Sequence, residues 1–231
     1  MAPSAPTRAE SVYQAIRRDV LAGRLLPGSR LRFADLCRRY EASMSVLREG
    51  LARLAEQGLV VAEPQHGFHV TPVSADDLRD LTGARLALEG LVLRRAIESG
   101  DVAWEAQLVA ALHTLERTPM LDAADAALFN EEWTAAHATY HTALLAGCDN
   151  ARLRSVAAGL RDSAELYRRW SRRLGHDEDR DIPGEHRAIV AAVLERDADR
   201  AVALLMAHIG RTSDVLLAAE RARLLPGERS A

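Results

Sequence analysis

Several residue types are scarce in this sequence of 231 residues, and each scarcity excludes a class of protein. Lysine is absent, so all 30 basic residues are arginine. The two cysteines, Cys37 and Cys148, lie far apart and form no CxxC pair, which excludes a disulfide scaffold and a cysteine-based zinc site. Aromatic residues make up only 4% of the chain, whereas leucine and alanine dominate. We therefore expect an aliphatic, helical core and not a β-sandwich.

Long apolar segments are missing as well. No apolar run approaches the roughly 20 residues of a membrane span. The first residues, MAPSAPTRAE, lack the basic and then apolar pattern of a signal peptide. The composition, 48% hydrophobic and 27% charged, is that of an ordinary globular chain with one or two domains. We expect a soluble cytoplasmic protein without a membrane partner.

Charge is distributed unevenly along the chain. Residues 1–72 contain 10 arginines and 7 acidic residues, whereas residues 73–231 contain 20 arginines and 26 acidic residues. A small basic unit joined to a larger acidic one is typical of a protein with a nucleic-acid-binding end and an end of another function. The asymmetry is modest, so by itself it favours this interpretation only weakly.

The first part of the chain has the pattern of a winged helix-turn-helix. Apolar residues at helical spacing predict three helices, and two short apolar runs around a glycine predict a β-hairpin. Three helices and a hairpin, with a short turn before the third helix, are the elements of this fold. We therefore expect a DNA-binding domain at residues 8–72. The helices are predicted from the capping box at Thr7 to Gly23, over 33–40 and over about 45–57, and the strands over 59–61 and 68–70.

The remainder of the chain has a helical pattern almost throughout. Residues 71–73 interrupt the pattern and residues 74–77 restart it as a second capping box, which marks a domain boundary. No strand candidate and no internal repeat follows. We expect an antiparallel all-α bundle over residues 75–222, so that the whole chain is mainly α. Its helices are predicted over 75–99, 101–117, 125–147, 150–174, 184–196 and 198–222, with a solvated acidic loop over 175–184.

Candidate DNA-reading residues gather around the third predicted helix. In a helix-turn-helix, early residues of the second helix meet base edges and flanking residues hold phosphates. Ser43 and Ser45 can cap the helix and donate to phosphate, and Arg48 can reach phosphate or guanine. Taken singly, each is equally an ordinary surface residue, and the order of the elements is what favours DNA binding. The candidates are Arg32, Arg38, Ser43, Met44, Ser45 and Arg48, with His66 and Gly67 in the wing.

Four of the eight histidines form a candidate metal site. His137 and His141 project from one helix face, and His186 and His208 belong to the last two helices. Imidazoles from three helices of a bundle bind a divalent metal well because the scaffold fixes their geometry. Zn²⁺ is the metal expected of imidazoles, with Ni²⁺, Co²⁺ and Mn²⁺ as alternatives. Two histidines four residues apart are nevertheless more often ordinary helix residues than ligands.

Residues 8–72 resemble the DNA-binding domain of the GntR family of bacterial transcription regulators. The resemblance rests on AGRLLPGSRLRFADLCRRYEASMSVLREGLARLAEQGLV and on the wing sequence GFHV. Three positions depart from the family pattern, because Met44 stands where Arg is common, Gly50 where Ala is usual, and His69 where a GFRV-like wing has Arg. Without Arg at position 44 a base or phosphate contact is lost, which implies an operator different from the family's commonest one.

Residues 75–222 are similar to the FadR C-terminal effector domain of one large GntR subgroup. That domain binds a metal through an Asp-x-x-x-His pair, a His after Glu and a His in the last helix. The resemblance implies His141, His186 and His208 as ligands. His137 stands in the place of the Asp, so it is either a fourth ligand or a residue that supports the other three.

The resemblance also concerns the effector. It implies that Arg85 faces the pocket and pairs with an effector carboxylate, although Arg85 could equally pair with Glu89 one turn later. The segments 100–105 and 146–148, and His137 in the first ligand place, are similar to one branch, the carbon-starvation-induced regulators. That branch responds to a short dicarboxylate, glutarate, which implies a small carboxylate effector for this chain.

Together these features predict a homodimeric transcriptional repressor that binds an inverted-repeat DNA operator under the control of a metal-bound carboxylate. A metal-dependent hydrolase is the main alternative, and it would need a general base near the metal. Glu185 adjoins His186 but should point elsewhere, and no HExxH motif, nucleophile elbow or phosphate loop occurs. We therefore expect no enzyme. A structural DNA-binding protein with an unliganded dimerisation domain is the third interpretation.

Overall fold

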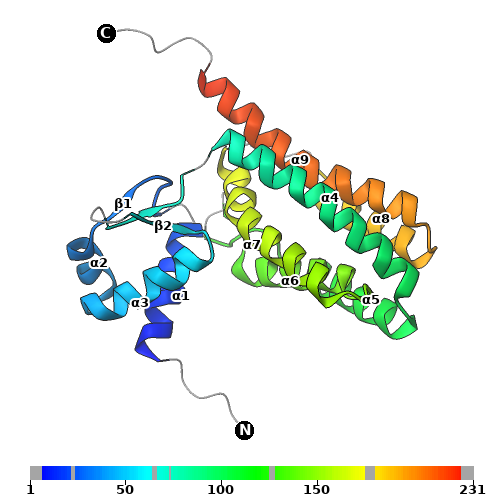
Figure 1. Ribbon diagram of the computed structural model, residues 1–231, viewed down its shortest axis with the longest axis horizontal. Helices are drawn as coiled ribbons and strands as arrows, with labels where there is room; N and C mark the ends of the chain where they lie inside the picture. The colour runs from blue at the N-terminus through cyan, green and yellow to red at the C-terminus, as the bar shows by residue number, and fades with distance from the viewer. Residues whose placement is uncertain are drawn as a thin grey trace. The chain divides into compact units, whose positions relative to one another are not determined.

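The computed structural model divides the chain into two compact units, Met1–Ser74 and Ala75–Ala231 (Figure 1). It describes residues 7–21, 24–63, 67–72, 74–124, 128–174 and 180–224, with the side chains at 166, 170–174 and 219–224 excepted. Helices dominate both units, which confirms the predicted mainly α fold class.

The N-terminal unit combines three helices with a small antiparallel sheet in the strand order β1-β3-β2. β1 has only two residues, too few to produce a recognisable pattern, and it was not expected from the sequence. This arrangement is a winged helix-turn-helix, with β2 and β3 as the wing. The elements are α1 (Arg8–Leu21), β1 (Arg30–Leu31), α2 (Phe33–Tyr40), α3 (Met44–Glu56), β2 (Val60–Glu63) and β3 (Gly67–Val70).

An aliphatic core holds this unit together. α1 packs against α3, and α3 packs against α2 and β2. The core residues recur at helical spacing, which is why the sequence pattern predicted these helices. Gly28 (φ 69°) and Gly67 (φ 90°) take left-handed backbone conformations that glycine adopts without strain. The buried residues include Val12, Ile16, Val20, Leu21, Leu36, Leu47, Leu51, Leu54 and Leu59.

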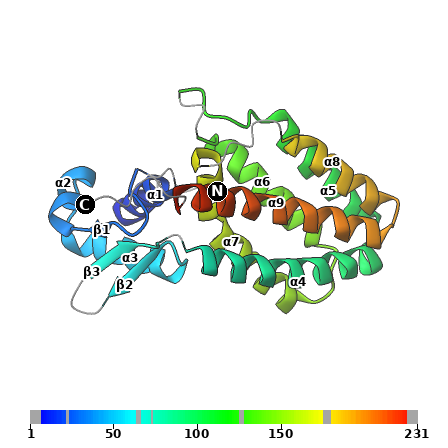
Figure 2. The same ribbon diagram turned by 90° about the horizontal axis from the view of Figure 1, so that it is seen from above.

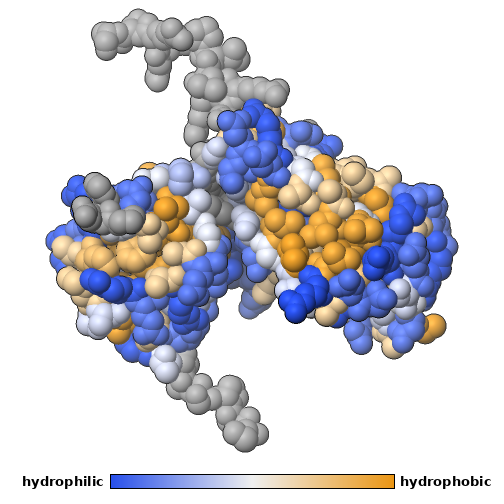
Figure 3. Space-filling view, viewed as in Figure 1, coloured by the Kyte–Doolittle hydropathy of each residue, from blue (hydrophilic) through white to orange (hydrophobic). Residues whose placement is uncertain are grey.

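The C-terminal unit is a bundle of helices. In both views α9 lies alongside α4 and runs antiparallel to it, and α4 also packs against α7 (Figures 1 and 2). α5 packs against α6, and α8 against α9. Apolar residues also gather on the outer face over α4 and α7 (Figure 3). Among the exposed large hydrophobic residues, Leu91 belongs to α4 and Val156 to α7. The helices are α4 (Ala75–Ser99), α5 (Val102–Arg117), α6 (Glu131–Leu145), α7 (Ala151–Leu174), α8 (Ile182–Leu194) and α9 (Ala198–Leu224).

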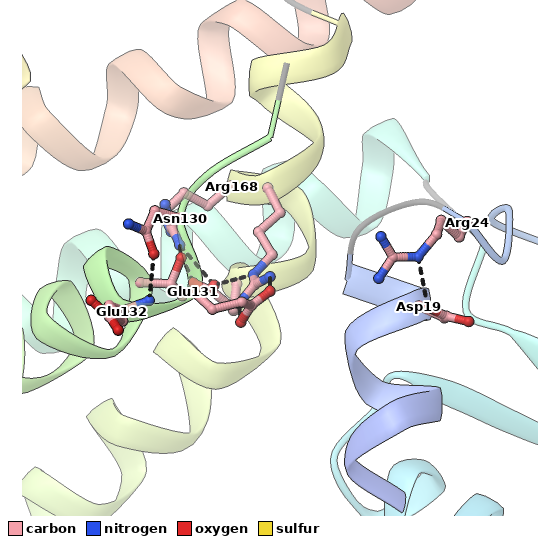
Figure 4. A network of polar contacts seen from close by, with 9 residues as sticks. Asp19, Arg24, Asn130, Glu131, Glu132 and Arg168 are labelled. Carbon is pink, nitrogen blue, oxygen red and sulfur yellow. Dashed lines mark hydrogen bonds and ion pairs between the residues drawn. The ribbon is translucent and has the colours of Figure 1, made fainter. Parts of the chain in front are cut away.

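Two helix starts differ from the sequence prediction by more than one residue, and a capping side chain explains each. α6 begins at Glu131, because the side-chain oxygen of Asn130 accepts the backbone N–H of Glu132 at 2.8 Å (Figure 4). Its start was predicted at 125. Residues 125–127 lie outside the described residues, and residues 128–130 are not helical. α8 begins at Ile182 and not at 184, because Asp181 caps it in the same way. Before α6, an isolated antiparallel bridge joins residues 121 and 129, where no extended pairing was predicted.

The packing of the Trp104 side chain explains why glycine occupies two turns of the bundle. The Trp104 ring packs against Gly100 and Gly147, and its Nε1–H donates to the carbonyl of Ala143 at 2.8 Å. A Cβ atom at position 147 would lie 2.7 Å from Trp104 Cδ2 and 2.7 Å from the carbonyl oxygen of Ala96. The two segments that resemble one branch of the family, residues 100–105 and 146–148, therefore both pack around the Trp104 ring.

One helix among the described residues, over Ala198–Ala218, is long and apolar enough to cross a membrane by length and composition. This segment belongs to α9, which packs against α4, α7 and α8. A core helix of a bundle passes the same test, so the match is weak evidence for a membrane span.

Candidate functional site

The outer face of α3 carries the residues predicted to read DNA. Ser43 caps this helix, since its backbone is extended and its hydroxyl accepts the N–H of Val46. The opposite face of α3 is buried in the core, which leaves the outer face to solvent. Met44, Ser45 and Arg48, together with Glu49 and Ala52, line a shallow hollow of about 590 Å³.

An aromatic pair lies beneath Arg48. The guanidinium of Arg48 is 5.6 Å from the centroid of the Phe33 ring, which comes from α2. Phe33 in turn meets Phe68 of β3 edge to face, with the ring centroids 6.1 Å apart. The cation–π contact orients Arg48 without using its hydrogen-bond donors. Those donors remain suited to a phosphate or a guanine.

The other predicted DNA-binding residues are distributed around this face. Arg32 precedes α2 as an exposed residue, and Arg38 of α2 pairs with Asp35 on the surface. Gly67 begins β3 at the wing, whereas His66 lies outside the described residues. In the same unit, Asp19 accepts hydrogen bonds from Arg24 (Figure 4), Arg39 and the Tyr40 hydroxyl.

The four predicted metal ligands converge in the bundle. α6 supplies His137 and His141, α8 supplies His186 and α9 supplies His208. One ring nitrogen from each lies within 4.8 Å of those of the other three, and all four side chains are buried. The Nε2 atoms of His137 and His141 are 3.2 Å apart. We call this group the histidine cluster.

Burial keeps the histidine cluster uncharged at neutral pH. Burial is the largest cause that lowers the pKa of each of the four, and charge on the neighbouring imidazoles lowers it further for His137, His141 and His186. The pKa of His186 falls to about 2. His141 Nδ1 and His186 Nε2 have no hydrogen-bond partner among the described residues. Neutral imidazoles with unused lone pairs fit a divalent metal ion.

Glu185 lies beside the histidine cluster, which corrects the expectation that it points elsewhere. Its Oε2 is 2.6 Å from Nδ1 of His208 and 2.7 Å from the Arg180 guanidinium. Burial raises the pKa of Glu185, but hydrogen bonds from His208 and Arg180 outweigh this effect and lower the pKa to about 2. The charged carboxylate favours the His208 tautomer with its proton on Nδ1, which leaves Nε2 as the unprotonated nitrogen.

A buried ion pair from α4 belongs to the same region. Arg85 Nε donates to Glu89 Oε1 at 2.7 Å, so the predicted pair one helical turn apart is present. The charge of Arg85 contributes, after burial, to the lowered pKa of His141 and of His208, which places it near the cluster. Arg161 of α7, which the sequence did not single out, donates from Nη1 to the His141 carbonyl at 2.6 Å.

Comparison with known proteins gives a family to each unit. Residues 8–70 match the model of bacterial regulatory proteins of the gntR family, and residues 80–211 match the FCD domain. BphR of Paraburkholderia xenovorans strain LB400, named an HTH-type transcriptional regulator, is 40% identical over 90% of this chain and 84% of its own length. GlaR of Escherichia coli K12, named an HTH-type transcriptional repressor, is 34% identical over 85% of this chain and 90% of its own length.

Solved structures have the same fold. A GntR regulator from Rhodococcus sp. RHA1 covers 93% of this chain at 21% identity with a TM-score of 0.66, and 99% of that protein is matched. McbR/YncC of E. coli covers 94% at 18% identity with a TM-score of 0.68, and 100% of it is matched. With a winged helix-turn-helix, a bundle of this fold and full-length relatives, the chain belongs to the gntR family with an FCD domain and is a DNA-binding transcriptional regulator, not an enzyme.

Proposed function

We propose that this regulator is a homodimeric repressor that a small carboxylate, bound beside a divalent metal, releases from an inverted-repeat operator. In this proposal residues 8–72 bind DNA and residues 75–222 hold the metal and the effector. The convergence of four buried, uncharged histidines near Arg85 carries the proposal. The repressor role is supported by the printed name of GlaR, which is 34% identical.

The α3 face would read the operator, with Arg48 as its principal contact. Two-fold symmetry doubles the few base pairs that one helix can read, so a dimer on an inverted repeat is expected. Arg48→Ala should weaken operator binding at matched salt while its circular dichroism stays unchanged. Arg117→Ala, an exposed arginine of α5, is the control. Unchanged affinity of the Arg48 variant would refute this role for α3.

The apolar face of α4 and α7 would pack against a second copy of the chain. Leu91 of α4 is 46% exposed and Val156 of α7 is 56% exposed. Apolar patches such as the one over these helices (Figure 3) mark interaction surfaces. Leu91→Glu should convert the dimer to a monomer in sedimentation velocity. Val102→Glu, at a residue of α5 that is 76% exposed, should leave the dimer intact. A dimer that survives Leu91→Glu would place the interface elsewhere.

The histidine cluster would hold one divalent metal per subunit, with Zn²⁺ expected and Ni²⁺, Co²⁺ or Mn²⁺ as alternatives. His141, His186 and His208 are the proposed ligands, and His137 is a fourth ligand or a supporting residue. A bound dication supplies positive charge that attracts a carboxylate. Elemental analysis of protein purified without a histidine tag tests this directly. Full metal retention after His141→Ala combined with His208→Ala would contradict the assignment.

The effector would bridge the metal and Arg85. Arg85 lies on α4, whereas the histidines lie on α6, α8 and α9, so one bridging ligand can change how these helices pack. The ligand acts only through its different affinity for the two arrangements. Arg85→Ala should bind the operator normally and no longer respond to the effector. We would screen short mono- and dicarboxylates, glutarate among them, by thermal shift; stabilisation by neutral or cationic metabolites alone would refute the carboxylate.

A further inference from the structure

Met44 occupies an exposed position at the start of the recognition helix. It is the first residue of α3, directly after the capping residue Ser43, and the residue is 53% exposed. Early residues of a recognition helix meet base edges in the major groove. A thioether has no hydrogen-bond donor and only a weak acceptor, so it cannot read a base through the hydrogen bonds that Arg or Asn form.

The neighbours of Met44 offer complementary chemistry. Met44 lines the hollow on α3 together with Ser45, Arg48, Glu49 and Ala52. Met44 and Ala52 carry apolar side chains, whereas Ser45, Arg48 and Glu49 carry polar groups. Arg48, oriented by Phe33, supplies the donors for a guanine or a phosphate next to these apolar side chains. The face therefore presents one apolar surface and one donor side by side.

The major groove contains only one apolar group on the base edges, the C5 methyl of thymine. We propose that Met44 is a specificity-determining residue that packs on one thymine methyl in each half of the operator. The inference rests on the proposed role of the α3 face, and it is independent of the metal and the effector. According to this proposal, Met44 selects thymine, whereas an arginine at residue 44 would select guanine.

The test compares thymine with uracil, which differ by this methyl group alone. Full-length dimer first selects its operator from a pool of random DNA duplexes. Each thymine of that operator is then replaced by deoxyuridine, and affinity is measured by fluorescence anisotropy at fixed salt. Removal of one buried methyl should weaken binding about fourfold, and removal in both half-sites about 15-fold.

Variants connect this loss to Met44. Met44→Ala should bind the thymine and uracil operators equally at that position, whereas Met44→Leu should keep the thymine preference. Val61→Ala, at another exposed apolar residue of the same unit, should discriminate as the unmodified protein does. Selection with Met44→Arg should replace the thymine with guanine.

Two results would overturn the inference: a dimer insensitive to uracil at every thymine, or a uracil effect that persists unchanged in Met44→Ala. Either result leaves the role of α3 intact provided Arg48→Ala still weakens binding. If Arg48→Ala binds the operator normally, the α3 face itself is not the reading surface and the proposed function fails at that point.

Discussion

In the metal-free protein, lowering the pH from about 7 to about 5 should destabilise the helical domain while most of its carboxylates are still charged. Burial lowers the pKa of every member of the histidine cluster, and that of His186 to about 2, whereas an unfolded histidine titrates near about 6.5. Below that pH the unfolded chain binds more protons than the folded one. The contribution of the cluster to stability is therefore complete above about pH 6.5 and is lost as the pH falls toward the folded-state pKa values.

The size of the effect follows from the number of histidines. Each one contributes up to about 1.4 kcal/mol per pH unit, so four contribute up to about 5.6 kcal/mol per pH unit. A domain with a stability of about 5–15 kcal/mol would then unfold one to three units below about pH 6.5. Glu165 and Glu185 also have lowered pKa values, but unfolded glutamate titrates near about 4.3. Above about pH 5 the loss therefore belongs to the histidines.

Urea unfolding of the metal-free protein, followed by far-UV circular dichroism in steps from about pH 7 to about pH 5, measures this slope. His141→Gln should reduce the slope by about 1.4 kcal/mol per pH unit. His113→Gln, at an exposed histidine of α5, should leave it unchanged. If the free energy of unfolding stays constant within about 1 kcal/mol over this range, the imidazoles are not buried and uncharged as described.

Three further substitutions test individual contacts. Glu185→Gln should weaken metal affinity about 10- to 100-fold in competition with a chromophoric chelator, because the carboxylate orients a ligand ring, while Glu195→Gln at the exposed end of α8 should not. Gly50→Ala should raise the free energy of unfolding by about 1 kcal/mol, because its Cβ would make an ordinary 3.6 Å contact with the α1 backbone inside a helix. Gly147→Ala should lower it, because its Cβ would collide with Trp104. A change of opposite sign in either glycine variant would contradict the packing described.

The presence of most helices could be predicted from the sequence, because apolar spacing and capping residues are features of neighbouring residues. Apolar spacing and capping residues predicted α2 and α4 with the observed bounds. Asn130 and Asp181 were equally available as capping signals, and weighing them would have placed the starts of α6 and α8 correctly. β1 has two residues, and its pairing with β3 depends on the tertiary fold.

The functional site could be predicted only in part, for the same reason. The projection of His137 and His141 from one helix face follows from their spacing, but their meeting with His186 and His208 depends on how three helices pack. The residues alone indicated that convergence only weakly, and the family resemblance was the stronger evidence for it. The contact of Glu185 with His208 could not be predicted, because His208 lies on α9 and no local pattern specifies which face of α9 meets α8.

Binding of one labelled operator to the full-length protein, measured by anisotropy during titration with short dicarboxylates, tests the control mechanism most directly. We predict that a dicarboxylate releases the metal-loaded protein, and that neither the chelator-treated protein nor the metal-loaded Arg85→Ala variant is released by it. Equal release with and without metal would contradict the account, as would operator binding that no carboxylate changes.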